Sequence, residues 1–414
     1  MAKLLCYTSP ARGHLFPVMP TLLEVARRGH EVVLLTLADE APRVAAAGLR
    51  ARAIAGSIEA IPHDDHRAKS AGDGLDRAAR VFVARAEHEI PDLEAALAAE
   101  RPDALLVDFN CWGASAVAER SGLPWALFMP YFLPWRLPGL PPFGPGLAPR
   151  GDLLGRARDF VAGKIVHRLM NQNLARMNGV RARVGLPGLA DMLEQGRAAP
   201  RILYYTSEPF EYACSARPAS VVMVGPGLFE PPSARPEWLD RVDRPLILVA
   251  CSSEYQDDGA IVHAALDAFG DEDAFVVATT GGVDPASFRP RARANVRVER
   301  FVAHGPLLER AACVVCHGGM GITQKALAAS VPVCVVPFGR DQLEVARHVE
   351  VARAGVRIDR RSLTPARLRA AVHAAMALNE GAGRVAAGFR AAGGAARAAS
   401  ELEQLMAART DRWH

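Results

Sequence analysis

The chain has 414 residues, of which 50% are hydrophobic and 23% are charged, and its formal net charge is +4. One hydrophobic core rarely grows beyond about 300 residues, so we expect two domains. The arginines and lysines are scattered and form no basic block, which argues against a nucleic-acid-binding protein. The start, "MAKLLCYTSPARGH", is not expected to act as a signal peptide, and no segment reaches the roughly 18 apolar residues of a membrane span. We therefore expect a cytoplasmic protein with no integral membrane segment.

The first half alternates short apolar strands with helices. Strands are predicted at 3–8, 31–37, 49–54, 103–109 and 123–129. Helices are predicted over 41–48 and 111–122, and another is expected to end at Gly29. The run "DALLVDF" is typical of a parallel strand that helices cover on both faces. This pattern predicts a doubly wound parallel sheet.

The second half repeats this pattern. Strands are predicted at 244–253, 274–282, 295–301, 312–319 and 331–339, with helices at 257–270, 321–330 and 342–355. Between the halves, residues 226–242 are rich in proline and glycine and show neither period. The expected organisation is therefore α/β, with two Rossmann-like domains, 1–225 and 243–390, facing across a cleft and joined by the linker 226–242. We expect the tail, 391–414, to be a helix that crosses back to the first domain.

Residues 128–147, "FMPYFLPWRLPGLPPFGPGL", combine five aromatic residues with many prolines. Proline excludes a regular helix or a central strand here, so the segment is predicted to be a long loop. Ordered loops of this length are often functional, and this one could line an apolar pocket. The alternative is a loop that caps the core and binds nothing.

The seven cysteines fall mostly inside predicted strands, which indicates buried, reduced thiols. Cys313 and Cys316 have CxxC spacing, but a strand would point them to opposite faces. The stretch "HDDH", His63 to His66, lies in a polar loop and is a weak metal candidate. The sequence therefore predicts no metal site and no cofactor.

A glycine-rich turn, "CHGGMG", joins a predicted strand to a predicted helix at residues 316–321. Backbone N–H groups at a helix start, together with the positive end of the helix dipole, bind phosphate groups. The imidazole of His317 could add a donor beside them.

The motifs and their order resemble the family 1 glycosyltransferases of GT-B fold, of the bacterial natural-product group. The resemblance is carried by "SPARGHLFPVMPTLLEVARRGHEVVLLT" near the start and "LLVDFNCWGASAVAERSGLP" in the first half. It continues through "VMVGPG" and the stretch "CHGGMGITQKALAASVPVCVVPFGRDQ". It therefore spans essentially the whole chain.

The resemblance implies a role for each matching residue. His14 is expected to be the general base that takes the acceptor proton, oriented by Asp108. The residues expected to bind the diphosphate are Ser253, His317, Gly319, Met320, Gly321 and Ile322. Phe301 is expected to pack on the nucleotide base, whose edge the backbones of Val302 and His304 would contact. Asp341 and Gln342 are expected to bind the sugar hydroxyls. The expected acceptor-binding residues are Trp112, Tyr131, Phe132 and Trp135.

Three positions depart from the family pattern. Lys325 replaces a glutamate that is expected to bind the ribose hydroxyls, and lysine cannot accept hydrogen bonds. Ile322 replaces a frequent serine or threonine, and Val345 replaces a frequent asparagine. Ribose recognition must therefore differ in this chain or come from elsewhere.

The resemblance implies an inverting, metal-independent sugar transfer from a dTDP- or UDP-sugar to a small apolar acceptor. One alternative is a sugar-nucleotide epimerase on the same scaffold, which would need no apolar pocket. The other is a non-catalytic nucleotide-binding auxiliary subunit, which His14 and Asp108 argue against. The sequence leaves homodimer formation and the choice of acceptor atom open.

Overall fold

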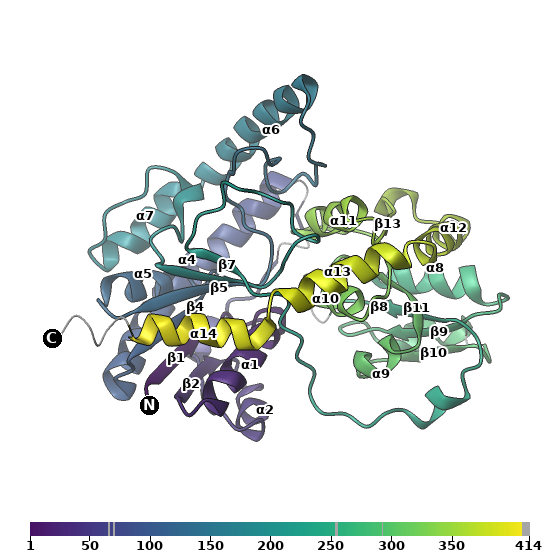
Figure 1. Ribbon diagram of the computed structural model, residues 1–414, viewed down its shortest axis with the longest axis horizontal. Helices are drawn as coiled ribbons and strands as arrows, with labels where there is room; N and C mark the ends of the chain where they lie inside the picture. Colours follow the sequence, from purple (N-terminus) through teal and green to yellow (C-terminus); the bar gives the residue numbers. More distant parts are fainter. Residues whose placement is uncertain (65–66, 69–70, 253–255, 292, 408–414) are drawn as a thin grey trace.

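The computed structural model describes residues 1–64, 67–68, 71–252, 256–291 and 293–407. Two parallel β-sheets form the centres of two halves, with helices packed around each (Figure 1). The first sheet has seven strands in the order β3-β2-β1-β4-β5-β6-β7. The second has six, in the order β10-β9-β8-β11-β12-β13. The predicted fold class, two doubly wound α/β units, is confirmed.

The elements of the first half follow the alternation that the sequence predicts, with additions. Its strands are β1 (Lys3–Tyr7), β2 (Glu31–Thr36), β3 (Arg50–Ala53), β4 (Ala104–Asp108), β5 (Trp125–Met129), β6 (Arg201–Tyr204) and β7 (Val221–Met223). Its helices are α1 (Arg12–Arg27), α2 (Ala41–Ala46), α3 (Gly56–Glu59), α4 (Ala71–Glu100), α5 (Trp112–Arg120), α6 (Leu153–Asn171) and α7 (Leu174–Arg183), with the 3₁₀ turn η2 (Met192–Glu194). The sequence analysis did not predict α4, α6, α7 and β6.

The second half begins after the 3₁₀ turn η3 (Glu237–Arg241). Its strands are β8 (Leu246–Ala250), β9 (Phe275–Thr279), β10 (Val296–Glu299), β11 (Ala311–Cys316), β12 (Val333–Val335) and β13 (Gly355–Arg357). Its helices are α8 (Gly259–Phe269), α9 (His304–Leu308), α10 (Met320–Ala328), α11 (Gln342–Val351), α12 (Pro365–Met376) and α13 (Asn379–Ala391), with 3₁₀ turns η4 (Pro285–Arg291) and η5 (Arg360–Ser362).

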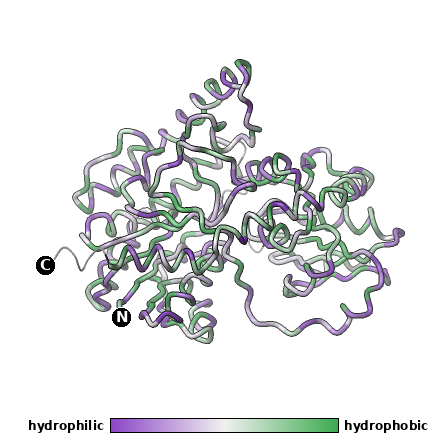
Figure 2. Tube along the Cα trace, in the orientation of Figure 1, coloured by the Kyte–Doolittle hydropathy of each residue, from purple (hydrophilic) through white to green (hydrophobic). Residues whose placement is uncertain are grey.

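The two sheets have the same topological switch point. In the first, β1 pairs in parallel with both β2 and β4, and in the second, β8 pairs with both β9 and β11. Helices leave such neighbouring strands toward opposite faces, which opens a crevice at their carboxyl ends. The central strands are fully buried, and hydrophobic colour follows them in Figure 2. Both crevices are therefore formed at the ends of buried, closely packed strands.

The last helix, α14 (Gly394–Ala407), packs against α1, β5 and β6 of the first half (Figure 1). Its Ala398, Ala399 and Leu402 are buried in the same hydrophobic cluster as Leu22 and Val25 of α1. The chain therefore ends its described part on the half in which it began. No helix among the described residues combines the length and the apolar character needed to span a bilayer.

The cysteine predictions hold where the structure can test them. All seven thiols are free. Cys313 and Cys316 are both buried, and they belong to different hydrophobic clusters on the two sides of β11. The CxxC spacing therefore brings no pair of thiols together.

Candidate active site

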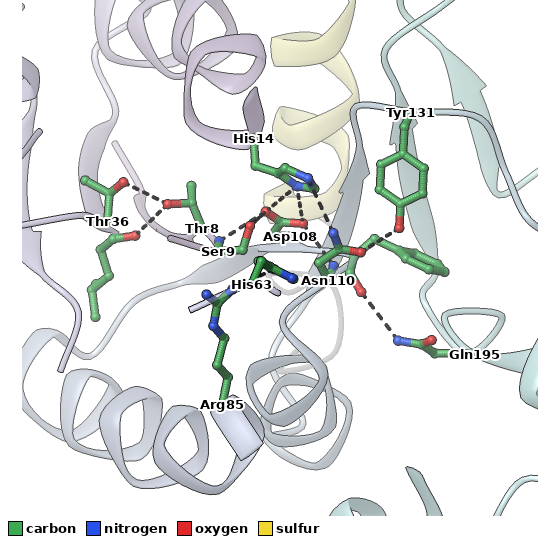
Figure 3. Close-up of polar contacts among 12 residues, drawn as sticks. Thr8, Ser9, His14, Thr36, His63, Arg85, Asp108, Asn110, Tyr131 and Gln195 are labelled. Carbon is green, nitrogen blue, oxygen red and sulfur yellow. Dashed lines mark hydrogen bonds and ion pairs between the residues drawn. The ribbon is translucent and has the colours of Figure 1, made fainter. Parts of the chain in front are cut away.

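His14 and Asp108 meet at the switch point of the first sheet. His14 lies in the first turn of α1, directly after β1, and Asp108 is the last residue of the adjacent strand β4. The imidazole Nδ1 lies 2.9 Å and 3.0 Å from the two carboxylate oxygens (Figure 3). Only 17% of the His14 side chain is exposed, and Asp108 is fully buried. The structure therefore brings this predicted pair together.

The Asp108 carboxylate is anchored by its own surroundings. It accepts hydrogen bonds from the backbone and hydroxyl of Ser9, at 3.1 Å and 2.8 Å, and from the backbone N–H of Asn110 at 2.9 Å. Burial by itself would raise the pKa of Asp108. The charge and hydrogen bond of His14, with these backbone donors, outweigh burial and hold the pKa below its ordinary value. The group is therefore an ionised, immobile acceptor for the imidazole.

Asn110 completes the surroundings of the imidazole, and the sequence analysis missed it. Its side-chain Nδ2 faces His14 Nε2 at 3.4 Å, while its Oδ1 accepts a hydrogen bond of 2.6 Å from the Tyr131 hydroxyl (Figure 3). Nδ1 lies against the two Asp108 oxygens, which can only accept, so it carries the proton, and Nε2 presents a lone pair to the amide. The hydrogen-bond partners thus favour the tautomer that can act as a base.

The second half contributes to the same crevice through Asp341. The ring of Tyr131 lies against His14, with centroids 5.8 Å apart. Burial raises the pKa of Tyr131 well above its ordinary value, and the charges of Asp108 and Asp341 add to the effect. Burial likewise raises the pKa of Asp341, and the charges of Arg340 and His14 oppose the rise. Asp341 therefore lies within electrostatic reach of the imidazole, from the facing half.

The helix α10 begins at the glycine-rich turn without a side-chain cap. Its N-cap, Gly319, offers no side-chain hydrogen bond, and the first helical turn closes where Thr323 N–H donates to Gly319 O at 3.1 Å. The amides of Met320, Gly321 and Ile322 therefore have no partner within the helix. Such amides, with the helix dipole, suit a phosphate group.

His317 lies directly before this helix start and is 5% exposed. Its Nδ1 is 3.5 Å from Asp258 and makes no hydrogen bond. Burial lowers the pKa of His317 to about 4, and the Arg340 charge also lowers it. The imidazole is therefore neutral at physiological pH. A Cβ on Gly319 would lie 2.5 Å from His317 Nε2, so glycine is required for this close approach.

Gln342 has a buried side chain whose partners all lie in the second half. Its Oε1 accepts hydrogen bonds from the backbone of Phe338 at 2.6 Å and Gly339 at 3.0 Å. Its Nε2 donates to Gln256 at 2.5 Å, and Gln256 in turn donates to Ser252 at 2.9 Å. Gln342 thus braces the loop before α11. Ser253, another predicted diphosphate ligand, lies outside the described residues.

A carboxylate from the linker contacts the backbone of His304, one of the predicted nucleoside-binding residues. The Phe301 side chain is 65% exposed, so its ring is accessible for stacking. Glu230 accepts hydrogen bonds of 2.7 Å from the backbone N–H groups of His304 and Gly305, and lies 3.5 Å from Lys325 Nζ. Val302 precedes this cluster. A carboxylate therefore stands beside Lys325, although it comes from a distant segment that the sequence analysis did not single out.

The four predicted acceptor residues have different surroundings. Tyr131 lies in the crevice, as described. Trp112 is 4% exposed and packs on Phe82, with centroids 5.3 Å apart. The Trp135 indole donates a 3.0 Å hydrogen bond to Gln195 O. Phe132 stacks on the imidazole of His348, in the second half.

The polar loop "HDDH" has one described contact near the site. His63 Nε2 lies 3.1 Å from Arg85, and both side chains lie below His14 and Asp108 in Figure 3. Asp65 and His66 lie outside the described residues. Within the described part of the chain, no group of three or more His, Cys, Asp or Glu side chains is arranged to hold a metal ion.

Comparisons with known proteins agree on one class. Residues 263–405 match the family model described as "Erythromycin biosynthesis protein CIII-like, C-terminal domain". The chain is 33% identical over 389 residues to 4'-demethylrebeccamycin synthase of Lentzea aerocolonigenes, covering 91% of this chain and 92% of the relative.

Solved structures agree in fold. The glycosyltransferase of kitacinnamycin superposes with a TM-score of 0.77 at 24% identity, over 98% of this chain and 99% of that one. The glycosyltransferase VinC, solved in complex with dTDP, gives a TM-score of 0.72 at 20% identity, with the same coverage of both chains.

Proposed function

The chain belongs to the GT-B glycosyltransferases of bacterial natural-product biosynthesis, and from this premise we propose that it transfers a sugar with inversion to a small apolar acceptor, using His14 as the base. The donor in this proposal is a dTDP- or UDP-sugar. The complex of VinC with dTDP supports a nucleoside diphosphate donor, and in this proposal its diphosphate lies at the start of α10. Asp341, facing His14 across the crevice, would bind the sugar between the two halves.

In the proposed reaction, the acceptor X–H group replaces the Asn110 amide at His14 Nε2. As the lone pair of X attacks the anomeric carbon, the proton passes to Nε2. The bond from that carbon to the diphosphate oxygen breaks at the same time, and the leaving diphosphate takes its electron pair. Attack opposite the leaving group inverts the anomeric centre. Proton removal of this kind contributes about 10²–10⁴-fold to rate.

Both charges that form in this step have a partner within the protein. The imidazolium that develops at His14 is paired with the ionised Asp108, 2.9 Å away. Negative charge on the diphosphate would be stabilised by the α10 amides and by a hydrogen bond from His317. Because these donors are already in place, little reorganisation is needed during the reaction.

The acceptor side is supported by the aromatic loop. Tyr131 covers the imidazole, and Phe109 packs against Tyr131 with centroids 6.3 Å apart. Burial holds the pKa of Tyr131 well above its ordinary value, so its hydroxyl stays neutral. An aromatic, uncharged wall suits a small apolar aglycone better than a second sugar.

The observation that carries the proposal is the fixed tautomer of His14, with Nδ1–H on Asp108 and a lone pair on Nε2. It is tested by incubating the enzyme with dTDP- and UDP-sugars, with EDTA present, and a panel of aromatic aglycones, followed by mass spectrometry. We expect a glycoside from wild type and very little from His14→Ala. NMR of the product should show the anomeric configuration opposite to that of the donor. Retention of configuration would contradict direct displacement.

A further inference from the structure

An imidazole from the second half is inserted between two aromatic rings of the first. His348, on α11, lies parallel to Phe132 with ring centroids 3.7 Å apart, and parallel to Tyr212 at 3.8 Å; both interplanar angles are 15°. His348 is 3% exposed. Neither the sequence analysis nor the proposed reaction uses this residue.

The partners of the two ring nitrogens define the charge of His348. Nδ1 lies 2.9 Å from the backbone oxygen of Glu344, and Nε2 lies 3.4 Å from a carboxylate oxygen of Glu211. A carbonyl oxygen and a carboxylate oxygen can only accept hydrogen bonds. Both nitrogens must therefore donate, which is the property of an imidazolium.

The stacking geometry agrees with a cation. Two neutral aromatic rings avoid direct face-to-face stacking, because their electron-rich faces repel. A cation over such a face is attracted to it. His348 has an aromatic face on each side, from Phe132 and Tyr212, so positive charge on the imidazole favours both contacts at once.

The other charges around His348 come from several elements. Tyr204 donates a hydrogen bond to Glu211, and the backbone N–H of Tyr212 donates to it at 2.7 Å. Burial opposes ionisation of Glu211, but the hydrogen bond and charge of His348 and these donors hold its pKa below the ordinary value. Arg217 lines the same small cavity as His348.

On α11 itself, the neighbouring charges already have partners. The Glu344 carboxylate accepts hydrogen bonds of 2.7 Å from the backbone N–H groups of Gly144 and Gly146. Arg347 pairs with Glu350 and donates to the Gly146 carbonyl at 2.9 Å. Glu211 is thus the carboxylate that faces the His348 ring.

The stack connects directly to the crevice. Phe132 follows Tyr131, whose ring contacts His14, and His348 lies two helical turns after Asp341 on the same helix. Residues seven apart share a helix face. The adjacent residues Tyr131 and Phe132 of the first half therefore contact the base and α11, respectively. The predicted sugar-binding residues lie at the start of α11.

We propose that His348, as an imidazolium clasped between Phe132 and Tyr212 and paired with Glu211, is a positioning residue that holds α11 and Asp341 in place against His14. This rests on the proposed function, because Asp341 is taken to bind the donor sugar. The clasp sets the geometry of the transferred sugar and leaves the nucleotide site untouched.

The test compares three variants at His348 and Glu211. His348→Phe keeps a stacking ring without charge, His348→Arg keeps a planar cation that cannot deprotonate, and Glu211→Gln removes the partner charge. We expect His348→Phe and Glu211→Gln to lower kcat about 10- to 100-fold with unchanged dTDP affinity, since small misplacement of the sugar is enough. His348→Arg, which keeps the positive charge, should retain more activity than His348→Phe.

Wild-type kcat in both His348→Phe and Glu211→Gln would overturn the proposal, as would a loss of kcat in His348→Arg as large as that in His348→Phe. If His348→Phe does not fold, as judged by circular dichroism, Glu211→Gln alone decides. NMR of the protein with labelled histidine gives a readout without turnover. An imidazolium signal for His348 at neutral pH, absent in His348→Phe, supports the clasp, and a neutral signal refutes it. A wild type with the imidazolium signal but no glycoside product would instead refute the proposed function.

Discussion

Two equivalent turns of the molecule can be compared. In the first half, β4 passes into α5 through Asp108, and in the second, β11 passes into α10 through His317. Each strand lies beside the first strand of its own sheet, so the two turns occupy the same place in two related frameworks. The polar groups of the first turn are hydrogen-bonded within the chain, whereas the second turn leaves hydrogen-bond donors open.

The first turn satisfies its polar groups from within the chain. The buried carboxylate of Glu89, on α4, accepts hydrogen bonds from the first amides of α5, Gly113 at 2.9 Å and Ala114 at 3.4 Å. Asp108 is bonded to Ser9, His14 and the Asn110 backbone. The Glu89 carboxyl group thus fills the place that an external anion could occupy.

The second turn leaves its donors open. No side chain caps α10, and His317 Nδ1 has no hydrogen-bond partner. In the proposed reaction, the proton-transfer site is therefore assembled before the substrate arrives, whereas the site for the charged leaving group keeps its donors available. Variants at the two turns should separate these two roles.

Removal of the base should impair proton transfer and leave nucleotide binding unchanged. We expect His14→Ala to lower kcat about 10²–10⁴-fold, because proton removal in the transition state is lost. Affinity for dTDP, measured by calorimetry, should match wild type. Unimpaired transfer to an alcohol acceptor would remove His14 from the role of base.

Asp108→Asn should act through the tautomer of His14. An amide can donate to Nδ1, which would place the proton on Nε2 and leave no lone pair for the acceptor. We expect kcat to fall about 10²-fold with dTDP affinity unchanged. Normal turnover of this variant, with a wild-type melting temperature, would show that the carboxylate is dispensable.

His317→Ala should have the reverse signature. The loss of one hydrogen bond to a charged ligand corresponds to about 10- to 100-fold weaker dTDP binding. Calorimetry of both variants separates the two turns, since His317→Ala should lose affinity for dTDP and His14→Ala should not. Equal affinities in the two variants would place the diphosphate elsewhere.

Tyr131→Phe tests how firmly Asn110 must be held. It deletes the 2.6 Å hydrogen bond to Asn110 Oδ1 but keeps the ring against His14. We expect kcat to fall about 3- to 10-fold, the range for one neutral hydrogen bond. Asn110→Ala is the matched variant, and a double mutant with additive effects would show that the two residues act independently.

Glu89→Gln should alter stability and its pH dependence. Burial raises the pKa of Glu89 to about 8, despite the Gly113 and Ala114 amides. The unfolded chain releases this proton near about pH 4.3, so the contribution of Glu89 to stability is full below that pH and is lost as pH rises through about 8. Glutamine cannot titrate, so the variant should melt about 2 °C above wild type at about pH 8.5. Identical pH slopes of melting temperature in both proteins would contradict this.

The fold could be predicted from sequence where strands are apolar and continuous. The strands β1, β2, β4, β5, β8, β9 and β12 lie within predicted runs, as do the more polar β3 and β10, and β11 begins one residue before its predicted run. The helix α4 was missed because its apolar residues are interspersed with charges and Pro91, although its proline is accommodated inside the helix. Local pattern therefore identifies the sheets better than their covering helices.

The site could be predicted only in part, for a physical reason. His14 and Asp108 were identified through the family resemblance, and the register of β1 beside β4 brings them together. Asn110 could have been suspected as a polar residue at a strand's carboxyl end. Glu230 and His348 meet their partners across 95 and 137 positions of sequence, and no local pattern encodes such pairings.

The return of α14 to the first half has a consequence for how the protein acquires its structure. Ala398, Ala399 and Leu402 complete a cluster whose other members, such as Leu22, leave the ribosome hundreds of residues earlier. The first half, which is synthesised first, therefore keeps an apolar surface exposed until the second half has been made. Truncation before residue 394 would leave that surface permanently bare and favour aggregation of a chain whose crevice residues are all intact.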